Sequence, residues 1–259
     1  MLKLVICECA KLKRSRVFVV SFLTTFRMPC MYALILKDKS LDNMMSVIRE
    51  ENGLLLLVPL SVVLAANLFF TEHDEDTLKN LLCIPVTKSR LAAAKLVVLL
   101  GFDICYEMTG FLAGTAAAAF AGADMDGLGM QLFLTLGTGV LVWAAAMPCI
   151  VLVIWCNRSY IISVIVAFAY TVGGYILRVN DRIMMVPLGP NVQTFLPAPM
   201  IIRWLYQYHP TKGMGGESLA FYERFAPYFV STPAVFFVLL AEAFLCAVLL
   251  TWIYKKQSV

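Results

Sequence analysis

The chain has 259 residues, of which 61% are hydrophobic and 15% charged, and its mean hydropathy is +0.81. Soluble domains are about 45–50% apolar and about 25% charged, so this composition excludes an ordinary soluble domain and indicates an integral membrane protein. The net charge of +4 reflects how Lys and Arg are distributed across the membrane, and it does not indicate nucleic-acid binding.

The first element expected along the chain is an amphipathic helix over residues 1–15. At about 100° per residue, its apolar side chains fall on one face, opposite Lys3, Lys11 and Arg14. The apolar face is formed by Leu2, Val5, Ile6, Cys9 and Leu12. A helix of this kind lies in the cytoplasmic interface of a membrane. The alternative is a plain basic flank of the first span.

Six apolar segments have the length that a helix needs to cross a membrane, about 20 residues. They are residues 17–36, 54–70, 96–122, 132–156, 160–177 and 234–254. Segments of this length exclude a β-barrel, whose strands would be about 10 residues of alternating polarity. The sequence therefore predicts one all-α integral membrane domain with six transmembrane helices.

The third span repeats small residues at every fourth position. These residues are Gly110, Gly114, Ala118 and Gly122. Small side chains let another helix approach closely, so the repeat predicts helix packing and no chemistry.

A polar insert, residues 72–90, separates the second span from the third. Asp74, Glu75 and Asp76 place negative charge at a helix start, where the helix dipole favours it, and Pro85 ends that helix. Three leucines form an i, i+3, i+4 apolar face, namely Leu78, Leu81 and Leu82. The pattern predicts a short amphipathic helix that needs lipid headgroups or a groove on another protein. An ordinary solvated loop is the alternative.

The long segment before the last span, residues 179–233, is apolar, aromatic and interrupted by prolines. Its helical pieces are too short to cross the membrane, and Trp and Tyr settle at membrane interfaces. We expect two short re-entrant helices in or on the outer leaflet.

Lys and Arg in short loops set the orientation. One side carries five of them in the N-terminal segment, four in residues 71–95, Arg158, and two at the C-terminal end. The short loops of the other side carry Lys37, Lys39 and Arg49. Both termini and the polar insert are therefore expected in the cytoplasm.

Four charged side chains fall inside the predicted spans: Arg27, Asp103, Glu107 and Glu242. Charges at this depth normally face the interior of a helix bundle and find partners. We predict that Arg27 pairs with Glu107 or Glu242. These charges either line a path through the membrane or form static packing contacts.

Motifs for catalysis and for metal or nucleotide binding do not occur. The sequence has no GxxxxGK[ST], HExxH or GxSxG motif, and His73 and His209 fall on opposite sides of the predicted membrane. We therefore expect no catalytic residue, no metal site and no enzyme activity in this chain.

The polar insert carries a family resemblance. Its pattern is Glu72, then Thr77-Leu78-Lys79-Asn80-Leu81-Leu82, then Pro85, Arg90 and Lys95. With this pattern and the six-span order, the chain resembles type-2 ABC transporter permeases, and among them the permeases of lantibiotic and bacitracin self-protection exporters. Asp76 stands where such permeases usually have Gly before the Thr-Leu pair.

The resemblance implies that the insert is a coupling helix, which docks on a separate ABC ATPase subunit. The coupling residues would be Glu72, Thr77, Leu78, Leu81, Leu82, Pro85 and Arg90. ATP and Mg would bind the ATPase, so this chain would hold no cofactor. A second six-span permease, the same or a related chain, would complete the transporter in the bacterial cell membrane.

The resemblance further implies a cargo, an antimicrobial peptide expelled for resistance or self-immunity. The outer segment would then offer aromatic contacts to the peptide, from Trp204, Tyr206, Tyr208 and Phe221. In the alternative reading, these aromatic residues only anchor the segment in the headgroup region. Export of a drug or lipid, and a non-transporting receptor or assembly protein, are the alternative functions.

Overall fold

The computed structural model describes residues 1–35, 40–74, 87–156, 159–211 and 215–256. The described residues are mostly helical, and their only bridge pairs Ser40 with Asp124. The helices are α1 (Leu2–Arg14), α2 (Arg16–Thr24), α3 (Arg27–Ile35), α4 (Leu41–Ile48), the π-helix η1 (Arg49–Leu57), α5 (Val58–Asp74), α7 (Lys88–Phe120), α8 (Leu128–Cys156), α9 (Tyr160–Val179), α10 (Asp181–Met184), the 3₁₀ helix η2 (Val192–Phe195), α11 (Pro197–Tyr206), α12 (Gly216–Phe225), the 3₁₀ helix η3 (Ala226–Tyr228) and α13 (Thr232–Lys256).

Five helical segments are long and apolar enough to cross a membrane. They are Leu41–Phe70, Lys88–Phe120, Leu128–Cys156, Tyr160–Val179 and Thr232–Lys256. They match the second to sixth predicted spans, and they confirm an all-helical membrane protein.

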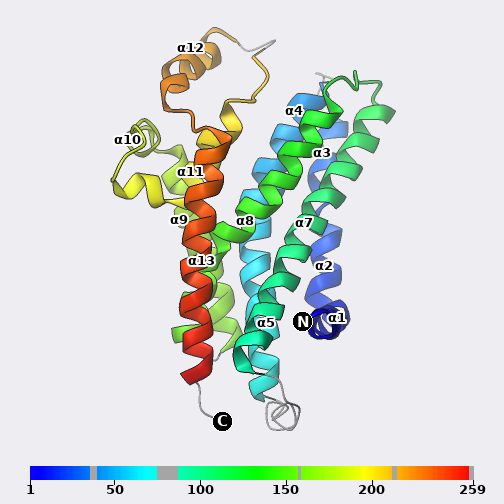
Figure 1. Ribbon diagram of the computed structural model, residues 1–259. Helices are drawn as coiled ribbons and strands as arrows, with labels where there is room; N and C mark the ends of the chain where they lie inside the picture. Colours follow the sequence, from blue (N-terminus) through cyan, green and yellow to red (C-terminus); the bar gives the residue numbers. More distant parts are fainter. Residues whose placement is uncertain (36–39, 75–86, 157–158, 212–214, 257–259) are drawn as a thin grey trace.

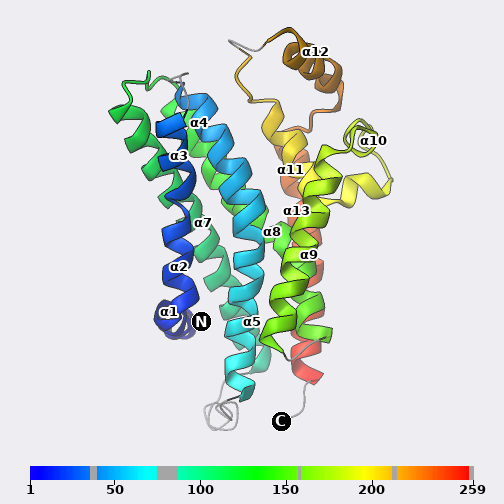
Figure 2. The same ribbon diagram turned by 180° about the vertical axis from the view of Figure 1, so that it is seen from behind.

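The two chain termini lie at the same end of the bundle (Figure 1). The end of α5 and the start of α7 lie at that end too, and α1 lies across it. Seen from behind, α5 and α9 run side by side, in agreement with their many contacts (Figure 2). The segments α10, α11 and α12 gather at the opposite end.

The first predicted span is two helices, α2 and α3, placed end to end along α7 (Figure 1). Pro29 explains the break, because it has no N–H to donate to the carbonyl of Thr25 four residues earlier. Asn52 replaces that donor, with its Nδ2 lying 2.9 Å from the Thr25 oxygen. Neither half alone has the length of a membrane-spanning helix, so the first predicted span, and with it the count of six, stays a prediction.

The second predicted span begins earlier than expected. The sequence places Arg49 in a short loop before the predicted span 54–70, but residues 41–53 continue the helix through α4 and η1. Arg49 and Asn52 are buried there, so the bundle rather than water surrounds them. Arg49 therefore does not belong to a loop, and it is no evidence for orientation.

The predicted small-residue repeat is a helix contact within the chain. A Cβ atom built on Gly114 would lie 2.5 Å from Ile48 of α4, and one on Gly110 would lie 3.4 Å from the same side chain. Gly122 has a different role: its φ of 71° lets the backbone turn, and the Ala123 N–H bonds to the Ala118 carbonyl to close α7.

Helix α8 is at the centre of the bundle, where it contacts α5, α7, α9, α11 and α13. Its contact with α7 is closest at Gly139, where an added Cβ atom would lie 3.1 Å from the Ile104 Cα atom. A side chain at this position would meet backbone, which cannot move aside as a side-chain tip can.

We expect Gly139→Leu to lower the free energy of unfolding by about 1–3 kcal/mol, because overpacking forces two core helices apart. Gly101→Leu in α7 is the control, since nothing lies within 4 Å of the Cβ position there. Thermal unfolding in detergent measures both. Equal melting temperatures for the two variants would contradict the close α7–α8 contact.

The outer segment contains the two expected short helices, α11 and α12, in different surroundings. Helix α11 lies among α8, α9 and α13, and its residues from Pro199 to Leu205 are buried. Most of α12 is exposed. The prediction that these two helices re-enter the membrane from its outer side stays a prediction.

Candidate functional site

The candidate site starts at η1, where the π-helical turn carries Arg49, Glu50, Glu51 and Asn52 into the bundle. Single π-helical turns within helices often mark functional sites. Successive residues of this turn face different neighbours. Arg49 and Asn52 turn towards α8 and α2, whereas Glu50 and Glu51 turn towards α9.

The inner side of η1 is a buried hydrogen-bonded chain. Arg49 donates to Gln131 of α8 and to Ser46, and Gln131 donates to Asp42 at 2.7 Å. Glu107 of α7 lies against Gly53, and it is in electrostatic range of Arg49. Arg49 is therefore the positive centre of this hydrogen-bonded chain, with the carboxylates of Asp42 and Glu107 near it.

The outer side of η1 faces Arg178, at the end of α9. The Arg178 guanidinium lies 3.8 Å from Glu50, 3.5 Å from Glu51 and 4.5 Å from the Tyr175 ring. Its side chain is only 10% exposed, and its Nη1 atom has no hydrogen-bond partner among the described residues. These ion pairs are long, so no short direct bond holds the guanidinium.

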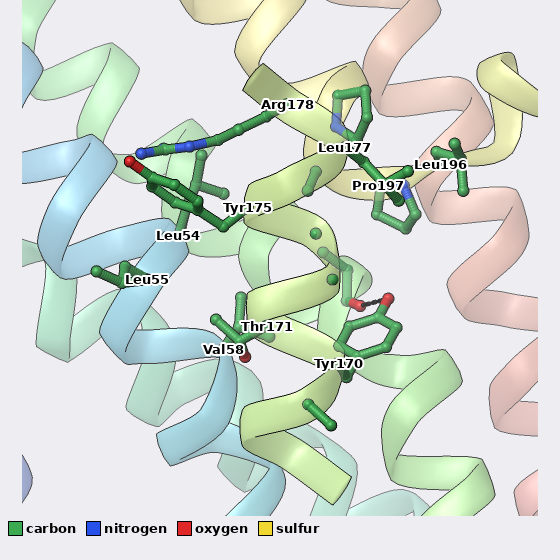
Figure 3. A pocket seen from close by; sticks show the side chains of 16 residues that line it. Leu54, Leu55, Val58, Tyr170, Thr171, Tyr175, Leu177, Arg178, Leu196 and Pro197 are labelled. Atoms are coloured by element: carbon green, nitrogen blue, oxygen red, sulfur yellow. Dashed lines mark hydrogen bonds between the residues drawn. The ribbon is translucent and has the colours of Figure 1, made fainter. Parts of the chain in front are cut away.

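An apolar cavity of about 230 Å³ lies between η1, α5, α9 and α11 (Figure 3). The polar groups of its wall bond within the bundle: Tyr170 donates to the Ala145 carbonyl and Thr171 to the Ala167 carbonyl. Arg178 is the one charged residue among those that line it. The cavity therefore suits an apolar group, with one polar end at Arg178.

A second cavity, of about 360 Å³, also has Arg178 in its lining. Its lining is aromatic and charged, comprising Glu50, Arg178, Val179, Asp181, Met184, Ile202, Tyr206, Phe221 and Phe225. Burial and, next, the Glu50 carboxylate raise the pKa of Tyr206, while Arg178 acts in the opposite direction. The two cavities share Arg178, so it lies where an apolar space meets an acidic aromatic one.

The end of the bundle that carries both termini has its own buried charge contact. Lys95 of α7 lies 2.8 Å from Glu8 of α1, and it donates to the Leu68 carbonyl of α5 at 2.6 Å. The lysine also lies 5.5 Å from the centre of the Phe69 ring. One side chain thus joins α1 to the two helices that flank the polar insert.

The predicted coupling residues fall largely outside the described structure. Thr77, Leu78, Leu81, Leu82 and Pro85 are outside the described residues. Glu72 lies in α5, but its side chain is outside the description. Arg90 is exposed in the first turn of α7, the helix that begins after Thr87.

The predicted intramembrane charges do not form one cluster. Asp103 is buried and accepts a bond from Ser61 at 3.0 Å, and Glu242 of α13 lies apart, near Tyr170. Arg27 is exposed at the start of α3, and the ion pairs of the described residues do not join it to Glu107 or Glu242. The structure therefore does not support the Arg27 pairing, and Arg49 stands near Glu107 instead.

The predicted aromatic contacts divide into two groups. Trp204 is completely buried and donates to Thr232, which also bonds to Tyr208, so these two side chains pack α11 against α13. Tyr206 and Phe221 line the outer cavity, with ring centres 6.4 Å apart. Trp204 is thus unavailable as a contact surface, whereas Tyr206 and Phe221 are available.

Sequence reasoning missed Glu8, Glu50, Glu51 and Arg178. Glu8 lies on the same face of α1 as Leu12, four residues later, and both side chains are buried. An acid on this apolar face indicates that the face contacts protein as well as lipid. The other three stand at the ends of predicted spans, where charges are normally assigned to solvent. Only their placement on neighbouring helices shows that they meet.

The fold and the site define a helical membrane protein in which two cavities share Arg178 and lie beside a group of buried charged residues. The sequence matches the profile of the ABC-2 family transporter proteins over residues 4–174, more than half of the chain. The chain therefore belongs to the ABC-2 family of transporter membrane components, which work with an ABC ATPase. A search of curated proteins finds no significant match.

Proposed function

We propose that this chain is the permease subunit of an ATP-driven exporter that expels an antimicrobial peptide of the lantibiotic or bacitracin type. The observation that carries the proposal is the pair of cavities that meet at Arg178, one apolar and one aromatic and acidic. An amphipathic peptide has side chains for both environments.

The transport cycle requires partners. An ABC ATPase supplies the energy with its bound ATP and Mg, and it docks on the coupling helix within residues 72–90. A second six-span permease completes the complex, with α2 and α3 counted as the first span. The Lys and Arg distribution supports an orientation with both termini in the cytoplasm of a bacterial cell.

Two alternatives use the same observations. A drug or lipid would also fit an apolar cavity with one polar end, and a non-transporting receptor would need no ATPase. Peptide export is favoured over a small apolar cargo because the outer cavity adds aromatic and charged groups that such a cargo does not use.

The test is ATP hydrolysis by the permease reconstituted with its ATPase. Bacitracin or a lantibiotic should stimulate the rate, and Leu81→Asp should abolish the stimulation. Burying a leucine contributes about 1.5–3 kcal/mol, so this change should weaken docking by about tenfold or more. Co-purification of the ATPase measures docking directly.

Leu219→Asp on α12 is the control, because it makes the same change at the opposite end of the bundle. Normal assembly and normal stimulation in Leu81→Asp would refute the coupling role. Stimulation by hydrophobic dyes but not by peptides would favour the drug alternative. A chain that recruits no ATPase would favour the receptor alternative.

A further inference from the structure

Two carboxylates share one guanidinium beside the outer cavity. Asp181 has its own ion pair with Arg224 at 3.2 Å, whereas the Arg178 guanidinium serves both Glu50 and Glu51. The buried Arg49 is also in electrostatic range of Glu50, but its guanidinium bonds to Gln131 and Ser46. The Glu50 and Glu51 side chains remain 23% and 28% exposed, so a further cation can reach them.

Aromatic rings of both cavities already contact positive charge, since Tyr175 lines the apolar cavity and Phe221 the outer one. The Arg178 guanidinium lies 4.5 Å from the Tyr175 ring centre, and Arg224 lies 5.7 Å from that of Phe221. The face of an aromatic ring attracts a cation, most strongly where water is excluded. Tyr206 and Phe225 add two more rings to the cavity lining.

We propose that Glu50 and Glu51, with these rings, form a binding site for the cationic group of an amphipathic cargo whose apolar part occupies the neighbouring cavity. This inference rests on the proposed export function and specifies the charge of its cargo. In the structure, the chain's own Arg178 guanidinium lies where the cargo's cationic group would bind, near Glu50 and Glu51. A cargo ammonium or guanidinium competes with it for the two carboxylates.

The geometry supports competition. Both Arg178 contacts are ion pairs without a hydrogen bond, and its Nη1 atom has no hydrogen-bond partner among the described side chains and backbone. A cargo cation that approached the carboxylates directly would form shorter, charge-assisted bonds. Since Arg178 lines both cavities, its displacement would open the boundary between them.

The experiment measures binding of three probes with the same ten-carbon alkyl chain: decylammonium, decanol and decanoate. The permease is held in nanodiscs of zwitterionic lipid, and empty nanodiscs correct for partition into lipid. We expect the cation to bind about tenfold more tightly than decanol, since charge-assisted and cation–π contacts contribute that much. Decanoate should bind most weakly.

Substitutions assign the site. Glu50→Gln with Glu51→Gln should remove the preference for the cation and leave decanol binding unchanged, whereas Arg178→Gln should tighten cation binding several-fold. Glu217→Gln, the same change on exposed α12, is the matched control. If the double variant does not fold, Glu51→Gln alone should lower the preference, because this side chain is partly exposed.

Equal affinity for the three probes, or an unchanged preference in the Glu50/Glu51 variants, would overturn the inference. The proposed function has a separate readout in peptide-stimulated ATP hydrolysis. If the cation binds but no peptide stimulates hydrolysis, the cation site at Glu50 and Glu51 stands and the export function is wrong. If hydrolysis is stimulated equally by cationic and uncharged cargo, the export function stands and the cation site is wrong.

Discussion

Replacing Lys95 by methionine is expected to lower the free energy of unfolding by about 3–5 kcal/mol. The lysine is fully buried, pairs with the buried Glu8 and bonds to the Leu68 carbonyl. Methionine fills similar space but leaves the Glu8 carboxylate without its buried cation and a carbonyl without its donor. Stability in detergent is measured by thermal or chemical unfolding.

Lys11 provides a matched control on the same acid. It lies 2.7 Å from Glu8, but its side chain is 40% exposed, and exposed ion pairs contribute about 0–1 kcal/mol. Lys11→Met should therefore cost far less than Lys95→Met. Combining Glu8→Gln with Lys95→Met should recover part of the loss, because the side chain at position 8 is then no longer a buried carboxylate without Lys95. Similar losses for the two lysines, or no recovery, would contradict the buried pair.

The same variant has a consequence for transport. Lys95 holds α1 against α5 and α7, whose ends flank the proposed coupling helix. The double variant Glu8→Gln/Lys95→Met tests this. If docking of the ATPase moves these helix ends together, its peptide-stimulated hydrolysis rate should fall by a larger factor than its folded fraction. A hydrolysis rate that follows the folded fraction alone would limit the contact to a structural role.

The second large effect is expected at Arg49, the cation of the buried chain between η1 and α8. Arg49→Met removes the donor to Gln131 and Ser46 and leaves Glu107 without the nearby positive charge. We expect a loss of about 3–5 kcal/mol, the usual result of removing one partner from a buried charge contact. Unfolding in detergent provides the measurement.

Two variants show whether charge or packing causes the loss. Arg49→Lys keeps the charge but lacks the planar fork of donors, so an intermediate loss is expected. Glu107→Gln added to Arg49→Met should restore part of the stability. Arg182→Met, an exposed position on α10, is the control and should change little. A methionine variant as stable as this control would exclude the charge contact.

The membrane architecture was largely readable from hydropathy. Long apolar runs predicted the two helices between Lys88 and Cys156, although α7 begins eight residues and α8 four residues before the predicted spans 96–122 and 132–156. In lipid a backbone must bond internally, and a helix of about 20 residues is the simplest solution. The α1 helix and the small-residue contact at Gly114 were predicted by their periodicity. The break in the first span was not predicted, although Pro29 removes a helix bond wherever it stands.

Charge was where sequence reasoning failed. Arg49, Glu50 and Glu51 stand beside an apolar run, and a single sequence cannot show whether such charges meet water or other helices. Hydropathy averages a window along one segment, whereas burial depends on which helices pack around it. The π-helix η1 determines which way these side chains point, and no local sequence pattern predicted a π-helix at these residues.

The sequence by itself determined which segments are helices in a membrane, because that depends on backbone bonding and apolar length along one stretch of chain. Only the tertiary structure decided the partner of each buried charge: Glu8 with Lys95, Arg49 with the neutral Gln131, and Arg178 with Glu50 and Glu51. The partners lie 82 to 128 residues apart in the chain. Their contacts exist because helix packing brings the elements together and excludes the water that would otherwise solvate each charge.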